Sequence, residues 1–308
     1  MNISCRYDRH HYDNSLNLKI NLSLCILLNS IFVVPAILMN AIVLAILRKK
    51  LTEMSITTGL LINLAVADLT IACFSIPSNI FVLGMTIQGR YPCTFTAVSI
   101  PISFFLAIVS FTTLGFLTID RYISFHYPLQ HRRLPIKPVV WSAISVTWVL
   151  PLFPVVKTAV SQRMETMDQF IIWVGSILTC INVFCHMRIY LLVRKHRRRI
   201  AADQSRFNST IVEKKETRLA ILGALLVVSI ILCYLPTICL SGLALAMGRA
   251  GRNTIGHLTY WAWTLALSNS FMNPIIKFFR LSSVRAAVIR FYTKHRHARA
   301  NRVQTLTT

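Results

Sequence analysis

The chain is 308 residues long, 55% hydrophobic and only 14% charged, with a mean hydropathy of +0.58. A soluble domain carries about a quarter charged residues, and the hydrophobic residues here fall in long blocks, so the composition argues against a pair of soluble domains. The net charge of +23 is compatible with nucleic-acid binding or with basic residues that flank membrane spans, and their positions decide between the two.

The first 21 residues are polar and of mixed charge, without the hydrophobic core of a cleavable signal peptide. We expect residues 1–21 to form an N-terminal segment outside the membrane, with the first span acting as the targeting signal. On the expected outer side, N-glycosylation sequons begin at Asn2 and at Asn21. A sequon also arises by chance, and Asn21 lies close to the first hydrophobic block, so both explanations stay open.

Seven hydrophobic blocks follow, each long enough for a transmembrane helix of about 20 residues. The seventh is the weakest, because it contains His257, Asn269 and Asn273. The blocks cover residues 22–47, 57–83, 95–122, 138–158, 169–193, 219–246 and 255–278.

Short loops join the blocks, and neither repeats nor low-complexity tracts interrupt them, which predicts one domain over residues 22–280. The largest inner loop, 194–218, contains no Gly or Pro and is expected to continue the fifth and sixth spans as helix. Residues 281–292 have the pattern of an amphipathic helix on the inner membrane surface, and 293–308 form a tail. The predicted fold is an all-α membrane protein: a seven-transmembrane helix bundle with an eighth, amphipathic helix.

The basic residues set the orientation. With the N-terminus outside, 25 of the 33 Lys and Arg residues fall on the inner side. Inner loops are rich in Lys and Arg in membrane proteins, so we expect an outer N-terminus and a cytoplasmic C-terminus at the plasma membrane. This distribution also accounts for the charge without a nucleic-acid partner.

Asp68 lies near the middle of the second span, where an ionisable group is costly. Its expected neighbours are Ser110, Asn269 and Asn273, with Asn40 also nearby. A carboxylate among hydroxyl and amide oxygens is suited to a small hard cation such as sodium. The alternative is a protonated Asp68 hydrogen-bonded to the same partners without an ion.

Several motifs occur in order on successive spans, and together they resemble the rhodopsin-class (class A) G-protein-coupled receptors over residues 22–292. They are Asn40 in span one, NLAVADL around Asp68 in span two, Asp120-Arg121-Tyr122 at the end of span three, Trp148 in span four, Tyr190 in span five, Cys233-Tyr234-Leu235-Pro236 in span six and Asn273-Pro274-Ile275-Ile276-Lys277 in span seven.

The resemblance implies roles for these residues in coupling to a heterotrimeric G protein. Arg121 would pair with Asp120 at rest and would reach Glu216 at the inner start of span six. Opening this latch would expose an inner cavity for the G-protein α subunit. Pro236 and Pro274 would kink spans six and seven, although a static kink is the simpler reading of either proline.

The chain departs from the family pattern at several positions. Tyr234 replaces the usual Trp, Lys277 replaces the Tyr of the NPxxY motif, and Asn182 replaces the usual Pro of span five. Lys277 puts the usual active position of span seven in doubt, since its side chain could instead snorkel to headgroups.

The usual disulfide of the family also lacks one partner, because residues 157–168 contain no Cys. Cys5 and Cys93 both face the oxidising side, so a Cys5–Cys93 bridge and two free thiols remain open. The short Cys-free loop is similar to that of melanocortin-type receptors. The acidic residues that those receptors carry at the outer ends of spans two and three are missing.

The resemblance also places a ligand pocket in the outer half of the bundle. Its expected lining is Ser103, Ala107, Tyr234, Ile238, Tyr260 and Trp263. Ser103 stands where amine receptors carry Asp and Leu267 where opsins carry the retinal Lys, so neither a monoamine nor retinal is expected. A lipid or part of a peptide suits this lining, but so does plain packing between helices.

The sequence therefore predicts a receptor that transduces an unknown extracellular ligand into G-protein activation and catalyses nothing itself. A transporter or channel that uses Asp68 is the alternative, weakened by few acidic groups in the membrane and no inverted repeat. An enzyme is disfavoured, because neither HExxH nor GxSxG occurs. No cofactor is expected beyond an allosteric sodium ion, and the remaining partners are membrane lipids.

Overall fold

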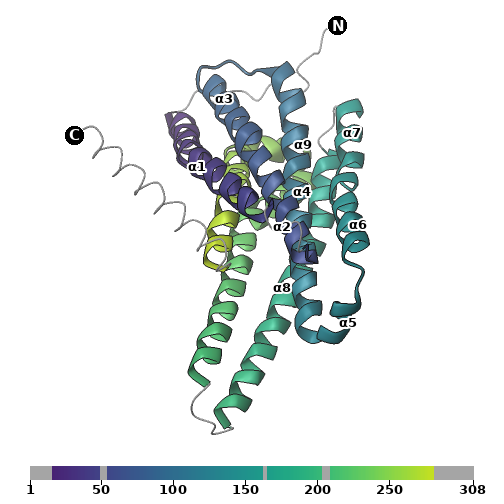
Figure 1. Ribbon diagram of the computed structural model, residues 1–308. Coiled ribbons are helices and arrows are strands. Elements are labelled where there is room, and N and C mark those ends of the chain that lie inside the picture. Colours follow the sequence, from purple (N-terminus) through teal and green to yellow (C-terminus); the bar gives the residue numbers. More distant parts are fainter. Residues whose placement is uncertain (1–15, 49–53, 162–164, 203–208, 281–308) are drawn as a thin grey trace, which may run out of the picture.

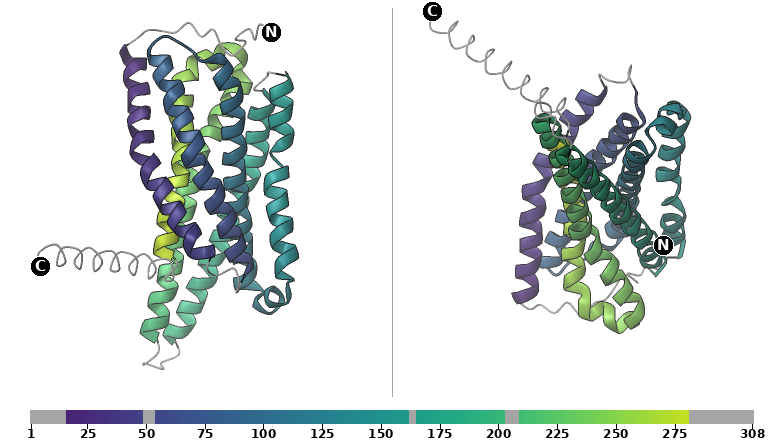
Figure 2. Two further views of the ribbon diagram at one scale, coloured as in Figure 1. Left: turned by 45° about the horizontal axis from the view of Figure 1, so that its top comes forward. Right: turned by 90° about the horizontal axis from the view of Figure 1, so that it is seen from below.

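The structure is a computed structural model, and it describes residues 16–48, 54–161, 165–202 and 209–280. The described part is helical throughout, with short turns and no strand. The helices run side by side along one axis and form an elongated bundle (Figure 1). Two of them extend beyond one end of it as a hairpin (Figure 2).

Helix α1 (Leu16–Arg48) is the first span and begins within the segment that we had assigned to the N-terminus, residues 1–21. Large hydrophobic residues stand exposed along one side of it at helical spacing, and they are Leu24, Leu27, Ile31, Val34 and Leu38. Residues three and four apart share a helix face. A hydrophobic stripe of this length is stable against lipid and costly against water.

The second span is longer than residues 57–83 and is not uniform. It consists of α2 (Ile56–Thr70), a π-helical turn (Ile71–Ser75) and α3 (Ile76–Ile87). Pro77 is the second residue after this π-helical turn, in the first turn of α3, and it has a ring but no N–H. Proline disturbs the preceding turn of an α-helix, and a π-turn is one way to accommodate it. Nothing in the hydrophobic pattern of this block indicated a π-helical turn.

Helix α4 (Cys93–His126) is the third span and lies at the centre of the bundle. It packs on the second span, on α6 and on α8. The main hydrophobic core gathers residues of most spans around it, among them Leu60, Leu64, Phe111, Leu114, Val140, Ile230 and Ala266.

The fourth span is divided. A short helix α5 (Pro128–Arg133) precedes α6 (Ile136–Val149), and α7 (Leu152–Ser161) continues the span after Leu150 and Pro151. Helix α8 (Glu165–Ala202) follows, and residues 162–164 between α7 and α8 lie outside the described residues. Both flanking helices therefore extend beyond the predicted blocks 138–158 and 169–193 into the segment between them.

The inner loop 194–218 is largely helical, as predicted, since α8 runs to Ala202 and α9 begins at Ser209. These extensions form the hairpin below the bundle in Figure 2. The intervening residues 203–208 lie outside the described residues.

Helix α9 (Ser209–Arg280) contains both of the last two predicted spans. Hydrogen bonds join Thr237 to Ala262 and Asn269 to Tyr234 within it. Residues 35 apart would be about 50 Å apart along one straight helix, so α9 must fold back between these pairs. The two halves therefore run antiparallel and correspond to the predicted spans six and seven.

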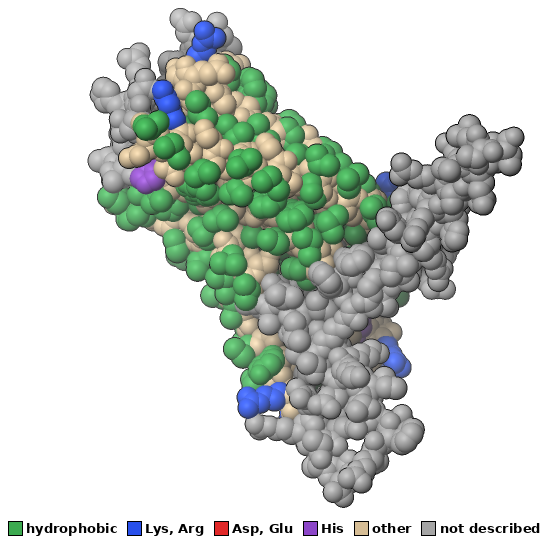
Figure 3. Space-filling view, turned by 90° about the vertical axis from the view of Figure 1, so that its left-hand side faces the viewer, with side chains coloured by type: hydrophobic (Ala, Val, Ile, Leu, Met, Phe, Trp, Pro, Cys, Tyr) green, Lys and Arg blue, Asp and Glu red, His purple; other side chains and the backbone are tan. Residues whose placement is uncertain are grey.

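Six described helical segments are long and hydrophobic enough to cross a membrane, and the half of α9 after Met247 is not among them. The hydrophobic side chains cover the middle of the face drawn in Figure 3, with Lys and Arg side chains toward its ends. The predicted amphipathic helix 281–292 and the tail 293–308 lie outside the described residues, as do the first 15 residues.

Candidate functional site

Asp68 is completely buried between three spans, in agreement with its predicted partners. The Ser110 hydroxyl donates to Oδ1 of Asp68 at 2.7 Å, and the Asn273 amide donates to Oδ2 at 3.0 Å. Both carboxylate oxygens are therefore held by hydrogen bonds from α4 and from the last part of α9. A buried carboxylate needs such partners, because an unpaired one is too costly in a medium of low dielectric constant.

Asn269 extends this centre through Tyr234. The Asn269 amide donates to the Tyr234 hydroxyl at 2.8 Å, and that hydroxyl also lies beside Ser110. The Oδ1 atom of Asn269 is buried and has no hydrogen-bond partner among the described residues, and the same holds for Oδ1 of Asn40. Such orphan acceptors call for a donor or a cation.

This arrangement fits the predicted sodium site. The site stays a prediction, in which an ionised Asp68 would supply the negative charge and Asn269 a buried oxygen that has no hydrogen-bond partner among the described residues. Carboxylate, hydroxyl and amide oxygens are ligands that small hard cations prefer. The hydroxyl of Tyr234 was predicted only as part of an aromatic switch, and its hydrogen bond to Asn269 could not be read from the sequence.

Further hydrogen bonds between polar side chains join the spans, and they were not predicted from the sequence. The Asn63 amide donates to Thr113 at 2.9 Å, and the Trp148 indole donates to Asn63 at 2.9 Å. Asn182, noted only as a missing Pro, accepts from Thr118 at 2.6 Å. Hydrogen bonds between transmembrane helices fix their register. The sequence could have indicated these pairs through the Asn residues that lie inside its hydrophobic blocks.

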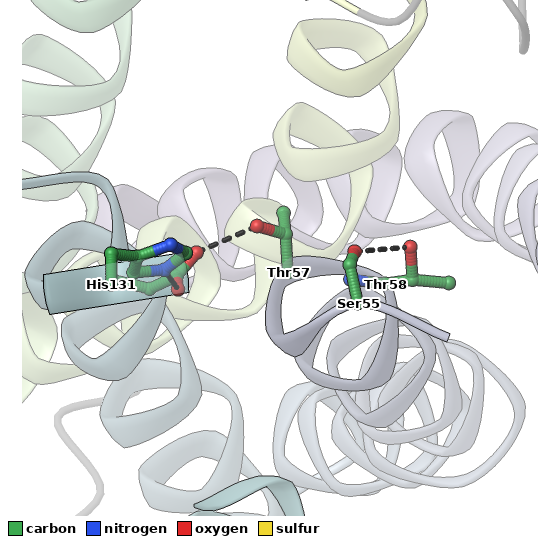
Figure 4. Close-up of polar contacts among 5 residues, drawn as sticks. Ser55, Thr57, Thr58 and His131 are labelled. Atoms are coloured by element: carbon green, nitrogen blue, oxygen red, sulfur yellow. Dashed lines mark hydrogen bonds and ion pairs between the residues drawn. The ribbon is translucent and has the colours of Figure 1, made fainter. Parts of the chain in front are cut away.

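At the inner end of α4, the Asp120 carboxylate is shared by two other elements. Thr57 of α2 donates to Oδ2 at 2.6 Å, and the His131 ring of α5 contacts Oδ1 at 2.8 Å. Figure 4 shows His131 near Thr57, with Ser55, whose side chain caps the start of α2, on the other side of Thr57. The carboxylate thus ties α2, α4 and α5 together.

The family resemblance predicted that Asp120 pairs with Arg121 at rest, and the structure differs from this prediction. No ion pair joins them among the residues with described side chains, and the buried Nε atom of Arg121 has no hydrogen-bond partner there. Adjacent residues on a helix point about 100° apart, so Asp120 faces α2 and α5 while Arg121 faces elsewhere. Nothing in the HRR run distinguished His131 from its basic neighbours.

The other predicted activation residues are only partly positioned. Tyr122 packs against His126 with ring centroids 4.3 Å apart, and Tyr190 is exposed on α8. Cys233 is buried with its sulfur 3.7 Å from the Ser268 hydroxyl. Pro236 and Pro274 lie within α9. The side chains of Glu216 and Lys277 lie outside the described residues, so the Arg121–Glu216 latch stays a prediction.

A small cavity opens between α4, α8 and both spans of α9. Four of the six predicted pocket residues line it, namely Ala107, Tyr234, Ile238 and Trp263. Ser103 is buried outside this lining, and Tyr260 packs on the cluster of Leu22, Cys25 and Leu83 instead. The additional lining residues, mostly aromatic or aliphatic, are Phe104, Ile108, Phe111, Phe170, Ile171, Val174, Gly175, Thr237 and Ala266.

The ring of Tyr234 links this cavity to the buried carboxylate. It stacks on Phe111 with centroids 4.2 Å apart, and both rings line the cavity. Its hydroxyl reaches Asn269 on the other side. A change in the cavity that moves this ring would therefore alter its hydrogen bond to Asn269.

Two predictions concern the outer end. Cys93 is disulfide-bonded, and the six other described cysteines carry free thiols. Cys5 lies outside the described residues, so its pairing with Cys93 stays a prediction. Peptide mapping without reduction checks it, and a Cys5 thiol that is freely alkylated would contradict it.

The sequon at Asn21 lies inside α1. Its amide nitrogen donates to the Asn17 carbonyl at 2.9 Å, and its oxygen accepts from the Trp261 indole at 3.1 Å. The nitrogen that would carry a glycan is thus engaged, which disfavours modification of Asn21. Asn2 lies outside the described residues.

Comparison with known proteins shows the family to which the chain is similar. Residues 39–171 and 156–276 match the sequence model of the family described as 7 transmembrane receptor (rhodopsin family). The galanin receptor type 2 of Mus musculus is 35% identical over 124 residues, which cover 40% of this chain and 32% of that receptor. The galanin receptor 2a of Danio rerio is 30% identical over 117 residues, covering 37% and 31%.

A longer match is less similar. The alpha-1A adrenergic receptor of Oryzias latipes is 26% identical over 275 residues, covering 72% of this chain and 56% of that receptor. The chain thus spans about a third of the galanin receptors and about half of the adrenergic receptor.

Proposed function

This chain belongs to the rhodopsin family of seven-transmembrane receptors, and from that premise we propose that it converts binding of an extracellular ligand into activation of a heterotrimeric G protein. It works in the plasma membrane with its N-terminus outside. The position of Tyr234 carries this proposal, because one side chain contacts both the outer cavity and the centre around Asp68.

The buried part of the ligand is uncharged and hydrophobic. Every described lining residue of the cavity is apolar or aromatic except Thr237 and the Tyr234 hydroxyl, and none carries a charge. A cationic amine would lose its hydration there without a carboxylate to replace it. A lipid chain or an apolar side chain of a peptide suits this lining better than a monoamine.

Signalling follows from a shift between two arrangements of the inner half of the bundle. The agonist and the G protein both favour the open arrangement, so each strengthens binding of the other. Arg121 stands at the inner end of α4, and its buried Nε has no partner in the described part of the chain. The proposed latch with Glu216 holds the closed arrangement.

Sodium is expected to stabilise the receptor through Asp68. At a sodium concentration ten times the Kd, a ligand of the folded state contributes about 1.4 kcal/mol, which corresponds to a few degrees in Tm. The isosteric Asp68→Asn variant keeps the volume of the side chain and loses the charge, so it should lose this shift. Thermal melting of the purified protein in sodium and in N-methylglucamine chloride measures it. Equal shifts in both proteins, or none in the wild type, would contradict the site.

G-protein activation in cells tests the receptor proposal, with surface levels matched and each class of α subunit assayed without ligand. Glu216→Ala should raise basal activation, because it removes the proposed latch. If neither the wild type nor Glu216→Ala activates any G protein, the Lys277→Tyr variant is tested next. It restores the usual residue of the family and should restore coupling. Continued silence together with sodium flux through the protein would replace the receptor by the transporter.

A further inference from the structure

A basic and hydrophobic surface lies at the turn between α5 and the start of α6, which we call the elbow (residues 128–141). Arg132, Arg133 and Lys137 are exposed on it. The sequence contains no Asp or Glu from residue 121 to 164. None of the three cations has a carboxylate partner among the described residues. The elbow is therefore a site of concentrated, uncompensated positive charge.

Large hydrophobic side chains stand exposed among these cations. Leu129 is 74% exposed and Trp141 is 64% exposed, and Ile136 is also exposed. Lys137 and Trp141 are four residues apart on α6 and thus share a face. The segment that begins at Ile136 is long and hydrophobic enough to cross a membrane, so this surface continues directly into the exposed hydrophobic side of α6. Trp and basic residues together are typical of the headgroup level of a bilayer.

The elbow is also connected to the signalling centre. His131 precedes Arg132 in the six-residue helix α5, and its ring is bonded to Asp120 of α4 at 2.8 Å. Asp120 in turn holds Thr57 of α2. A ligand that fixes Arg132 and Arg133 would therefore fix the position of α5 against Asp120.

We propose that the elbow binds the headgroup of an anionic phospholipid of the inner leaflet, and that the bound lipid holds α5 in its contact with Asp120. The proposal rests on the orientation proposed above. A phosphate adjoining acyl chains matches a surface on which cations and hydrophobic side chains alternate. The acidic surface of a G protein is the competing occupant, but it would not account for the exposed Trp141 beside Lys137 on a transmembrane helix.

Lipid binding can be measured on the full-length protein without any G protein. Native mass spectrometry counts phosphatidylserine molecules retained by the wild type, by a triple variant with Arg132→Gln, Arg133→Gln and Lys137→Gln, and by a control triple. The control carries Arg188→Gln, Arg194→Gln and Lys195→Gln, which removes the same charge from exposed positions on α8. We expect the elbow variant to bind phosphatidylserine at least about tenfold more weakly than the control.

Hydrogen exchange of residues 128–133 supplies the second measurement. In the wild type, exchange should be slower in nanodiscs containing phosphatidylserine than in pure phosphatidylcholine, and the elbow variant should lose this difference. Equal losses in both triples would show a general effect of charge and overturn the proposal. An elbow variant that retains lipid and loses only G-protein activation would assign the surface to the G protein instead. Absence of all G-protein activation with lipid binding intact would affect only the receptor proposal.

Discussion

An Arg121→Ala variant is expected to reach the cell surface and to lose G-protein activation by at least about tenfold, a loss of about 1.4 kcal/mol of coupling. The buried Nε of Arg121 lacks a hydrogen-bond partner among the described residues. A buried donor left unsatisfied costs about 1–3 kcal/mol. A G protein that binds from the cytoplasm can supply a hydrogen-bond acceptor for this Nε atom. Alanine has no donor there, so the variant loses this contribution to coupling.

The Arg121→Ala variant should lose G-protein activation without losing thermal stability. Removing an unsatisfied buried group relieves its desolvation cost, which offsets the loss of the proposed contact with Glu216, so the Tm of the Arg121→Ala protein should stay close to that of the wild type. Arg188→Ala, an exposed cation on α8, is the matched control and should retain activation. A variant that signals like the wild type at equal surface level would remove Arg121 from the mechanism.

A Gly59→Ala variant is expected to destabilise the bundle by about 1–3 kcal/mol, the usual cost of overpacking a tight core. A Cβ atom at position 59 would lie 2.5 Å from Cγ1 of Val140. The branched side chain of Val140 is stiff and is itself buried between α2 and α6. The helices must therefore separate or the valine must leave its rotamer.

Thermal melting of purified variants measures this effect, with Gly242→Ala as the control because nothing lies within 4 Å of a Cβ there. Both substitutions change glycine to alanine in a helix, so their intrinsic effects on helix stability are alike. Adding Val140→Ala should restore most of the stability lost at Gly59. If Gly59→Ala melts like Gly242→Ala, the close packing of α2 on α6 is wrong.

The sequence predicted the spans well and their ends poorly. Hydrophobic length alone located the blocks, because a membrane requires about 20 hydrophobic residues per helix. It could not show where helices continue past the hydrophobic blocks, as α8 does to Ala202, or where a π-helical turn precedes Pro77. Those features depend on local backbone geometry, which the hydrophobic pattern does not encode.

The part of the site around Asp68 could be predicted from the sequence, because a carboxylate inside a hydrophobic block needs polar partners. Asp68 inside a hydrophobic block requires partners, and Ser110 and Asn273 are indeed bonded to it. Asp120 was different, because it lies at a helix end where several partners compete. Its bonds to Thr57 and His131 depend on how α5 folds back, and a family pattern of adjacent charges could not show this.

The most direct test of the account is reconstitution of the purified receptor with purified heterotrimers of each α-subunit class, followed by measurement of nucleotide exchange. The account predicts that the wild type accelerates exchange on at least one class, that Glu216→Ala accelerates it further, and that Arg121→Ala does not accelerate it. Exchange rates equal to those of the heterotrimers alone for all three proteins, and for Lys277→Tyr as well, would contradict the claim that this chain couples to a G protein.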